Sequence, residues 1–332
     1  MRCPNLKDIP SPLPDKSGWP WTIESLKRTD GMPDGNSWPK ISIVTPSFNQ
    51  GRFIEETIRS ILLQGYPNLE YIIIDGGSSD ETVEVIKKYE RWLSCWVSEK
   101  DAGQADAINK GLHYATGEWF NWINSDDLLS PGALYEIASL ASGQGVVAGV
   151  TENFDSIGIC EKIANARLDP VALVSGSHSV VFHQPSLWLR LTYLLDCGGI
   201  DPKLHYVFDW EMLIRYLASY STVAYTNKTL ARFRLHDASK TVSLPHRFDA
   251  ERLVALTMLR DRCGNAEVRA AASLRYRHHV WWDQLEAEIQ KFYSSRWWSV
   301  SKILALTLQD PRVRLSRMTL GAIRQVLLRD DS

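Results

Sequence analysis

Three clusters of polar residues in the first 130 residues have side chains that could bind a nucleotide, a phosphate or a cation. They are Thr45 to Gln50, Asp75 to Asp80, and Asn124-Ser125-Asp126-Asp127. Each follows an apolar segment, and each taken alone could be only a turn or the beginning of a helix, because Ser, Asn, Asp and Gly favour both. Three such clusters in succession favour a binding site over three unrelated turns.

A bound diphosphate needs its charge neutralised, and the sequence lacks two common ways of doing so. No G-x-G-x-x-G follows the apolar segments, and no G-x-x-x-x-G-K-[ST] occurs. The alternative is a divalent cation that is held by oxygen ligands and bridges the phosphates. Asp126 and Asp127 suit a hard cation such as Mg²⁺ or Mn²⁺. The sequence therefore predicts a metal-assisted nucleotide site.

The apolar segments before the clusters have the composition of buried strands. We predict strands at 41–45, 70–75, 95–97 and 119–123, alternating with helices at 53–62, 83–89, 104–115 and from Pro131 onward. Ser78-x-x-Glu81 predicts a capping box for the second helix. This alternation predicts an α/β fold with a mostly parallel sheet. Ligands of such sheets bind beyond the carboxyl ends of the strands, where all three clusters fall.

The composition excludes several other classes of protein. Among 332 residues, 37 are basic and 39 are acidic, and the resulting net charge of −2 argues against a nucleic-acid partner. The five cysteines are widely spaced without a C-x-x-C, which is typical of reduced thiols. No apolar run of 18 residues and no signal-peptide pattern occurs, so we expect a cytoplasmic protein.

The order of these motifs resembles the family 2 glycosyltransferases of the GT-A fold, over about residues 40–245. The segments that carry the resemblance are ISIVTPSFNQ, IIIDGGSSDETV, SEKDAGQADAINKG and GEWFNWINSDDLLSPGAL. The resemblance implies a Rossmann-like, mostly parallel sheet flanked by helices. It also implies an inverting transfer of a sugar from a nucleotide-diphospho-sugar to an acceptor hydroxyl, with Mg²⁺ or Mn²⁺ as cofactor.

The resemblance assigns most of the three clusters to the nucleotide. Asp75 matches the residue that holds the nucleobase, and Asn124-Ser125-Asp126 occupies the D-x-D position, with Asp126 expected at the metal. Asn124 replaces the commoner aspartate, so it keeps an oxygen donor but not the charge. The nucleotide-binding residues implied are Thr45, Pro46, Ser47, Asn49, Asp75, Asp101, Asn124 and Ser125.

The later motifs are assigned to the acceptor and to the diphosphate. In Phe208-Asp209-Trp210-Glu211, Asp209 matches the catalytic base, with Glu211 as the second candidate and a helix cap as the structural alternative. His236 is a candidate metal ligand or phosphate contact, although a lone histidine in a loop is often only a surface residue. Arg232 and Arg234 are expected at the diphosphate, and Asp127, His183, Gln184 and Glu211 at the donor or acceptor sugar.

The expected partners are a UDP- or dTDP-type sugar donor and a glycan or lipid-linked acceptor, as in cell-surface polysaccharide synthesis. Two other functions stay open. A nucleotidyltransferase would normally have a Gly-rich phosphate loop after the first strand, and Thr45 to Gly51 is poor in glycine. A non-catalytic sugar-nucleotide-binding protein would not need Asp126 and Asp209.

We expect three parts: an irregular Pro/Trp-rich lead-in (1–40), a GT-A catalytic domain (41–245) and a helical C-terminal extension (246–332). The catalytic domain would consist of a nucleotide-binding half (41–130) and an acceptor half (150–245). Residues 247–332 carry a charge of +5, against −7 for the rest. Tryptophans beside basic amphipathic helices suit peripheral contact with the inner face of a membrane, and helices packed on the catalytic domain are the alternative.

Overall fold

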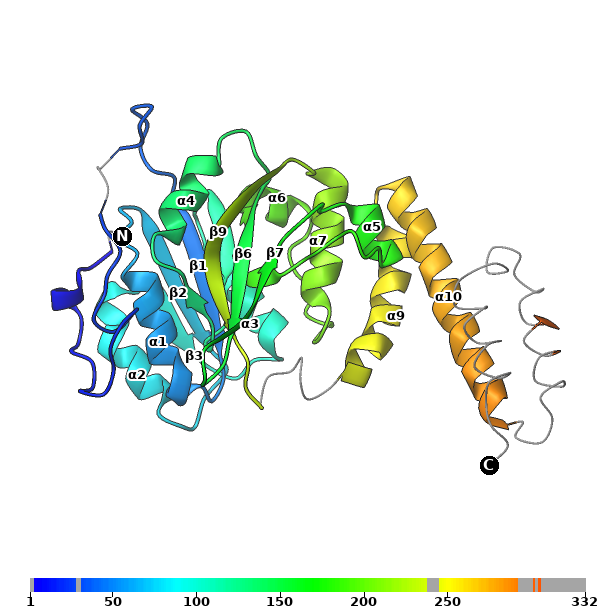
Figure 1. Ribbon diagram of the computed structural model, residues 1–332, viewed down its shortest axis with the longest axis horizontal. Helices are drawn as coiled ribbons and strands as arrows, with labels where there is room; N and C mark the ends of the chain where they lie inside the picture. Colours follow the sequence, from blue (N-terminus) through cyan, green and yellow to red (C-terminus); the bar gives the residue numbers. More distant parts are fainter. Residues whose placement is uncertain (1–2, 28–30, 238–244, 292–300, 302–303, 306–332) are drawn as a thin grey trace. The chain divides into compact units, whose positions relative to one another are not determined.

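The computed structural model in Figure 1 describes residues 3–27, 31–237, 245–291, 301 and 304–305. The chain divides into two compact units, Met1–Glu251 and Arg252–Ser332. All of the predicted site residues belong to the first unit, which therefore receives most of the description below.

The first unit is organised around one sheet in which the described strands follow the order β3-β2-β1-β4-β8-β6-β9-β5, with β7 paired to β6. The half containing β1 to β4 is parallel, as predicted. In the other half β6 and β9 are parallel, whereas β8, β7 and β5 pair antiparallel to their neighbours. The strands are β1 (Ile41–Ser47), β2 (Leu69–Asp75), β3 (Cys95–Ser98), β4 (Trp119–Trp122), β5 (Leu128–Leu129), β6 (Val146–Phe154), β7 (Ile159–Ala164), β8 (Leu187–Arg190) and β9 (Val223–Arg234).

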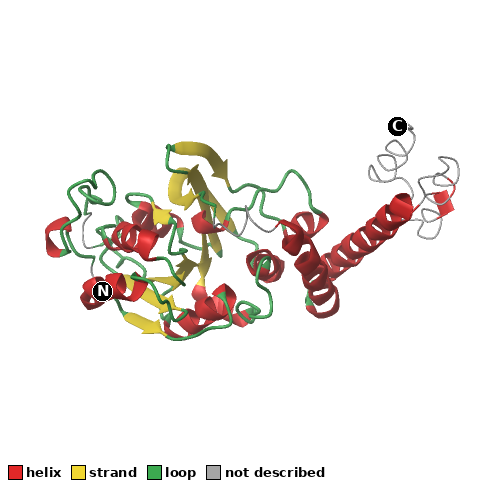
Figure 2. Cartoon of the chain, turned by 90° about the horizontal axis from the view of Figure 1, so that it is seen from below, coloured by secondary structure: helices red, strands yellow, loops and turns green. Residues whose placement is uncertain are grey.

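Helices flank the sheet, as Figures 1 and 2 show. Side chains of β1 alternate between two layers: Ile43 belongs to the same core cluster as Ile54 and Ile58 of α1, whereas Val44 faces Gly111 of α3. A Cβ at Gly111 would lie 2.5 Å from a methyl group of Val44, so α3 packs on the sheet only with glycine there. The helices are α1 (Gly51–Leu62), α2 (Thr82–Tyr89), α3 (Gln104–Tyr114), α4 (Ala133–Leu140), α5 (Pro170–Ser175), α6 (Leu191–Asp196) and α7 (Phe208–Ser219).

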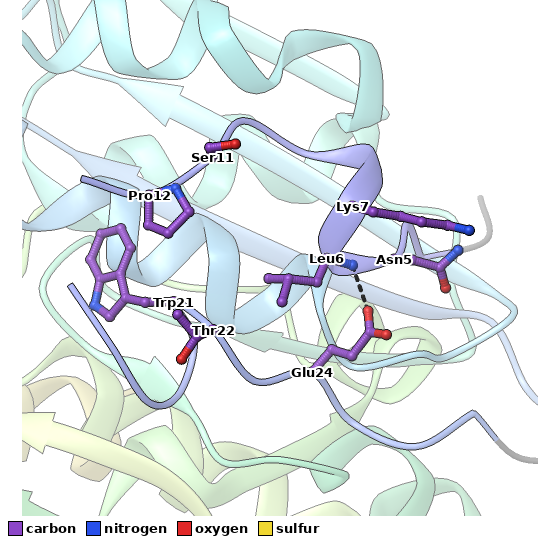
Figure 3. A pocket seen from close by; sticks show the side chains of 8 residues that line it. All are labelled: Asn5, Leu6, Lys7, Ser11, Pro12, Trp21, Thr22 and Glu24. Carbon is purple, nitrogen blue, oxygen red and sulfur yellow. Dashed lines mark hydrogen bonds between the residues drawn. The ribbon is translucent and has the colours of Figure 1, made fainter. Parts of the chain in front are cut away.

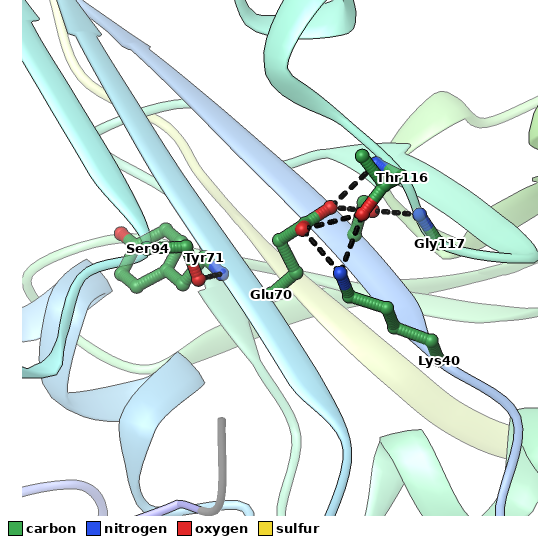
Figure 4. A network of polar contacts seen from close by, with 7 residues as sticks. Lys40, Glu70, Tyr71, Ser94, Thr116 and Gly117 are labelled. Carbon is green, nitrogen blue, oxygen red and sulfur yellow. Dashed lines mark hydrogen bonds and ion pairs between the residues drawn. The ribbon is translucent and has the colours of Figure 1, made fainter.

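A buried carboxylate joins the amino ends of the parallel strands (Figure 4). Glu70 of β2 forms an ion pair with Lys40 (2.5 Å) and accepts a hydrogen bond from the main-chain N–H of Thr116 (2.6 Å), just before β4. It also accepts from Ser42 of β1 (2.6 Å), which in turn accepts from the main-chain N–H of Gly117 (2.7 Å). Burial raises the pKa of Glu70, but these hydrogen bonds outweigh it and hold the pKa below its usual value.

The Pro/Trp-rich lead-in, which belongs to the first unit, packs against α1 through a buried arginine. Arg59 of α1 is fully buried and donates to the carbonyl groups of Pro10 (2.7 Å), Pro20 (3.2 Å) and Trp21 (2.9 Å). Its guanidinium also lies over the Trp21 ring, 5.1 Å from the ring centre. One buried guanidinium group thus donates hydrogen bonds to main-chain carbonyl groups from two turns of the irregular lead-in.

A hollow of about 560 Å³ is lined by residues of the lead-in (Figure 3). Asn5 and the first two residues of the 3₁₀ helix Leu6–Asp8 line one part of it, and Trp21 and Glu24 line another. The Glu24 carboxylate accepts the main-chain N–H of Leu6 (2.5 Å), so the two parts of the lead-in are joined across the hollow.

The predicted capping box at Ser78 and Glu81 is wrong. Helix α2 begins at Thr82 with Glu81 as its N-cap residue, and the Glu81 side chain forms no cap hydrogen bond. The Ser78 hydroxyl instead bonds to the Asp75 carboxylate. Asp80 accepts from the main-chain N–H of Thr82 (3.0 Å) and from that of Gly51 at the start of α1 (3.0 Å), so one carboxylate serves two helices.

The described part of the second unit is helical, as predicted for the C-terminal extension. Helix α10 runs from Ala266 to Lys291, and α9 (Pro245–Arg262) spans the boundary between the units. Trp297, Trp298 and the basic residues after them, on which the predicted membrane contact depends, lie outside the described residues. Within the part that is described, no helix has both the length and the apolar composition to cross a bilayer.

We predict that Glu70→Gln lowers the free energy of unfolding by about 2 kcal/mol at pH 7, because a buried hydrogen-bonded charge is replaced by an amide. Since the folded-state pKa is lowered, this contribution is complete above the ordinary glutamate pKa of about 4.3 and disappears as the pH falls through the folded value. Thermal unfolding between pH 3 and 7 measures the difference, with the exposed Glu84→Gln on α2 as control. A gap between Glu70→Gln and wild type that stays constant down to pH 3 would contradict this account.

Candidate active site

The first two polar clusters meet at the carboxyl ends of β1 and β2, where Ser47 pairs with Asp75. Asn49 has a positive φ of 52°, which asparagine tolerates better than most residues. Its main-chain N–H donates to Ser78 (2.7 Å), and its side-chain oxygen accepts from the N–H of Ser79 (2.9 Å). Asn49 therefore joins the two turns.

The two predicted nucleotide aspartates differ in exposure. Asp75 is fully buried and accepts hydrogen bonds from the N–H groups of Gly77 (3.1 Å) and Ser78 (2.9 Å), so its carboxylate shapes its own turn. Asp101 is half-buried, and one of its oxygens would lie 2.7 Å from a Cβ at Gly76. The Asp101 carboxylate thus lies directly against the glycine turn that follows β2.

The end of β1 is more buried than a ligand-contacting segment would be. Thr45 is fully buried and hydrogen-bonds to the hydroxyl of Tyr71 (3.1 Å), and Pro46 is also buried. Ser47 is 5% exposed, and its hydroxyl oxygen has no hydrogen-bond partner among the described residues. Of the three, Ser47 has a side-chain oxygen without a partner among the described residues, and that oxygen is itself buried.

In the third cluster, the side-chain amide of Asn124 is hydrogen-bonded to two other side chains. Asn124 accepts a hydrogen bond from the side chain of Gln104 (2.7 Å) and donates to the carboxylate of Asp127 (3.1 Å). Asp127 is fully buried, so its side chain has no exposed surface to offer a sugar, in contrast to the prediction. Burial, followed by the charge of Asp126, raises the pKa of Asp127 well above its usual value. Ser125 is also buried, with 4% of its surface exposed.

Asp126 meets a histidine that is 110 positions away in the sequence. Its carboxylate lies 2.9 Å from Nε2 of His236, just beyond the end of β9, and both side chains remain partly exposed at 21% and 16%. The His236 ring packs on Phe53 of α1, 4.9 Å between ring centres. A carboxylate and an imidazole at this distance form a pair of donors that a divalent cation could share.

The Asp126–His236 pair fits a cation whose other coordination positions are filled by a bound ligand. No group of three or more His, Cys, Asp or Glu side chains placed to hold a metal occurs among the described residues. Mg²⁺ commonly takes one or two protein carboxylates and fills its other positions with water and substrate phosphate oxygens. Asp126 and His236 could therefore supply part of a coordination sphere, and a bound diphosphate would supply more of it.

The two arginines at the end of β9 form ion pairs with glutamates. Arg234 pairs with Glu56 of α1 (2.7 Å) and donates to the main-chain oxygen of Asp126 (2.9 Å). Arg232 pairs with Glu152 of β6 (3.1 Å). Arg234 thus contacts the Asp126 loop directly, whereas Arg232 is placed further back along the strand.

On the acceptor side, Asp209 lies in the first turn of α7 and is half-buried. The N-cap residue of α7 is Val207, so the alternative in which Asp209 caps this helix is wrong. The cap comes instead from Glu251 of α9, whose carboxylate accepts the N–H groups of His205 (2.6 Å) and Val207 (2.8 Å). Glu251 belongs to the first unit and fixes the beginning of the helix that carries Asp209.

Glu211, the second candidate for the base, faces the interior. It is 1% exposed and forms an ion pair with Arg215 (2.7 Å). Arg215 also donates to the carbonyl of Gly199 (2.8 Å), so the pair braces the loop before α7. A buried, paired carboxylate is less suited than Asp209 to accept a proton from a bound hydroxyl.

His183 and Gln184 are mostly buried, and Gln184 contacts the end of β4. Gln184 is 8% exposed and donates to the side chain of Asn121 (2.7 Å) and to the carbonyl of Trp122 (2.9 Å). Burial lowers the pKa of His183 to about 4, so its imidazole is neutral at pH 7. Through these two bonds Gln184 holds the end of β4, the strand that leads to Asn124.

Sequence reasoning missed two side chains of α3 that hold neighbouring motifs. Gln104 bonds Asn124, and the side-chain amide of Asn109 donates to the carbonyl of Ile200 (2.7 Å) in the loop before α7. Both come from the segment SEKDAGQADAINKG, of which only Asp101 was assigned. Both residues lie on α3, which begins directly after the Asp101 motif, and this position in the sequence was the signal that could have identified them.

Comparison with known proteins identifies the family of this chain. A model of the family described as Glycosyl transferase family 2 matches residues 42–189. An uncharacterized glycosyltransferase of Mycobacterium tuberculosis is 35% identical over 182 residues, which are 54% of this chain and 69% of the relative. One of Rickettsia typhi is 25% identical over 214 residues, 61% of this chain and 66% of the relative's own length.

Two solved structures share the fold at low sequence identity. Staphylococcus aureus TarS 1–349 in complex with UDP-GlcNAc has a TM-score of 0.58 and 15% identity, covering 87% of this chain and 79% of that one. The mannosyltransferase PcManGT of Pyrobaculum calidifontis, in complex with GDP-Man and Mn²⁺, has a TM-score of 0.51 and 17% identity, covering 91% of each chain. The fold is thus the expected GT-A fold, and by its sequence match the chain belongs to glycosyltransferase family 2.

Proposed function

We propose that this glycosyltransferase moves a sugar, with inversion, from a nucleotide-diphospho-sugar to a hydroxyl group of a glycan or lipid-linked acceptor. The observation that carries the proposal is the meeting of Asp126 with His236, 2.9 Å apart, beyond the carboxyl edge of the parallel strands. This pair lies where the sheet's geometry favours ligand binding, and it combines donors that suit a metal–diphosphate complex. Synthesis of a cell-surface polysaccharide is the role that we propose for such a transfer.

The donor nucleotide would bind across the ends of β1 and β2. The exposed part of Asp101 is a polar group available there, whereas the N–H groups of Gly76 and Gly77 are bonded to Ser47 and Asp75. The fold neighbours were solved with UDP-GlcNAc and with GDP-Man, so the fold accommodates more than one base. We propose a UDP- or dTDP-type donor, with Asp75 shaping the base pocket and Asp101 contacting the nucleotide.

Asp126 and His236 would hold Mg²⁺ or Mn²⁺ together with the diphosphate. When bound, the cation would neutralise negative charge that grows on the leaving diphosphate. Arg234 orients this loop, since it donates to the main-chain oxygen of Asp126. The hydrophobic contact of His236 with Phe53 limits the motion of the imidazole.

Asp209 would act as the general base that removes the proton from the acceptor hydroxyl. Its carboxylate is half-buried at the start of α7, and the helix is fixed in place by Glu251 and by the Glu211–Arg215 pair. A base held in this way would accept the proton while the acceptor oxygen attacks the anomeric carbon on the face opposite the leaving nucleoside diphosphate, as an inverting displacement requires. Peripheral membrane contact through the C-terminal helices stays a prediction from the sequence, as does a cytoplasmic location.

We predict that Asp209→Asn lowers the transfer rate about 10²- to 10⁴-fold, the usual contribution of a general base. The measurement is release of nucleoside diphosphate from UDP- and dTDP-sugars in the presence of a mixture of glycan acceptors, with UDP-induced thermal stabilisation as the control for donor binding. Glu211→Gln should instead lower the unfolding temperature, because it breaks a buried ion pair. Full transfer by Asp209→Asn would exclude it as the base, and release of pyrophosphate by the wild type would indicate a nucleotidyltransferase.

We predict that His236→Ala raises the Mn²⁺ concentration needed for half-maximal turnover at least tenfold, because one of two protein donors is removed. Treatment with EDTA should abolish turnover, and added Mn²⁺ should restore it. The exposed His113→Ala is the matched control. Undiminished turnover in EDTA would refute an essential metal.

A further inference from the structure

We propose that Asn124 and Asp127 form a positioning pair that holds the Asp126 carboxylate against His236, and that an amide is needed at position 124 because a carboxylate stands at 127. Neither residue of the pair would touch the substrate. The proposal rests on the proposed function only in assigning the metal to Asp126, since the pair itself is visible in the structure.

Asp127 is the point at which three elements meet. Its carboxylate accepts the main-chain N–H of Arg234 at the end of β9 (3.0 Å) and the side-chain amide of Asn124 (3.1 Å). Its own main-chain oxygen accepts from the hydroxyl of Thr57 on α1 (2.8 Å). Because Asp127 is fully buried, these bonds form without competition from water.

The position of His236 depends on the same contact. Arg234 is two residues before His236, and its guanidinium donates to the main-chain oxygen of Asp126 (2.9 Å). The bond from the N–H of Arg234 to Asp127 therefore fixes the end of β9 beside the loop that carries Asp126. If Asp127 turned away, the distance between Asp126 and His236 would no longer be set.

The hydrogen-bond requirements explain the amide at position 124. Asparagine both accepts and donates, and Asn124 does both, from Gln104 (2.7 Å) and to Asp127 (3.1 Å). An ionised aspartate only accepts. An aspartate at 124 would keep the bond from Gln104, but it could bond to Asp127 only if one of the two carboxyl groups took up a proton, beside a third carboxylate at Asp126.

A reciprocal exchange would restore every bond. In Asn124→Asp/Asp127→Asn, the new amide at 127 could donate to the carboxylate at 124 and accept the N–H of Arg234 through its oxygen. The carboxylate at 124 would still accept from Gln104. The single substitution Asn124→Asp, although it creates the commoner D-x-D sequence, should therefore impair the protein, and the second substitution should repair it.

The experiment is a double-mutant cycle at pH 8 on the full chain: wild type, Asn124→Asp, Asp127→Asn and the double variant. Two readouts need no turnover, namely the unfolding temperature without ligand and the affinity for Mn²⁺ alone, measured by calorimetric titration. We expect Asn124→Asp to unfold at a lower temperature and to bind Mn²⁺ about tenfold more weakly, as loss of a group that orients a metal ligand usually does. The double variant should recover most of both.

A matched control separates this pairing from general effects of the substitutions. Asn68→Asp also removes an amide donor, the one that bonds to the carbonyl of Trp38 (3.1 Å), but it lies away from position 127. Adding Asp127→Asn to Asn68→Asp should therefore give additive losses and no recovery.

Two results would overturn the proposal. One is a double variant that is no better than Asn124→Asp in unfolding temperature. The other is an Asn124→Asp variant that binds Mn²⁺ more tightly, because position 124 would then be a metal ligand rather than a positioning residue. If Asn124→Asp alone does not fold, recovery of folded protein in the double variant supports the pairing, and failure of both overturns it. Wild-type protein that binds no Mn²⁺ would contradict the metal site, while the unfolding temperatures would still test the pair.

Discussion

The parallel pairing of β1 with both β2 and β4 is the constraint on which the site depends. It brings Ser47 beside Asp75 on one side and Val44 beside Trp122 on the other, so the turns after three strands emerge at one edge. The same pairing brings polar groups together at the opposite edge, where Glu70 joins Lys40, Ser42 and Thr116. The sheet is therefore tied at its amino edge, and its carboxyl edge is left to bind ligands.

Polar side chains with several hydrogen bonds organise segments of this protein that have little regular structure. The buried Arg59 satisfies carbonyl groups of the lead-in, the exposed Asp80 serves the starts of two helices, and the buried Asp127 joins a loop to β9. For Arg59 and Asp127 several hydrogen bonds compensate the burial of an ionisable group, which is the condition under which such burial is tolerated.

Local patterns in the sequence predicted the parallel half of the sheet and its turns. The apolar runs at β1, β2 and β4 fix both the strands and the edge at which the polar clusters meet. The capping box failed because Ser78 is drawn into the turn of Asp75, a competition that a four-residue pattern does not contain. The roles predicted for Asp127 and Glu211 did not take their burial into account. Asp127 bonds to Arg234, which comes close only after folding, and Glu211 pairs with Arg215, one helical turn away.

Contacts between distant segments were beyond local reasoning. The resemblance named both Asp126 and His236, yet nothing in the spacing of residues 110 positions apart indicates that they touch. Their meeting depends on β9 returning beside β6 and β5, which is a property of the mixed half of the sheet. That half lacks the regular alternation of strand and helix that made the first half readable.

The contact of Glu251 with the start of α7 has a consequence for where this chain can be divided. The family match ends at residue 189, yet the helix that carries Asp209 is held at its beginning by a glutamate from α9. A protein cut after residue 245 would keep every recognised motif and still lack this support. The part of the chain that shapes the first unit therefore extends beyond the recognised motifs, into α9.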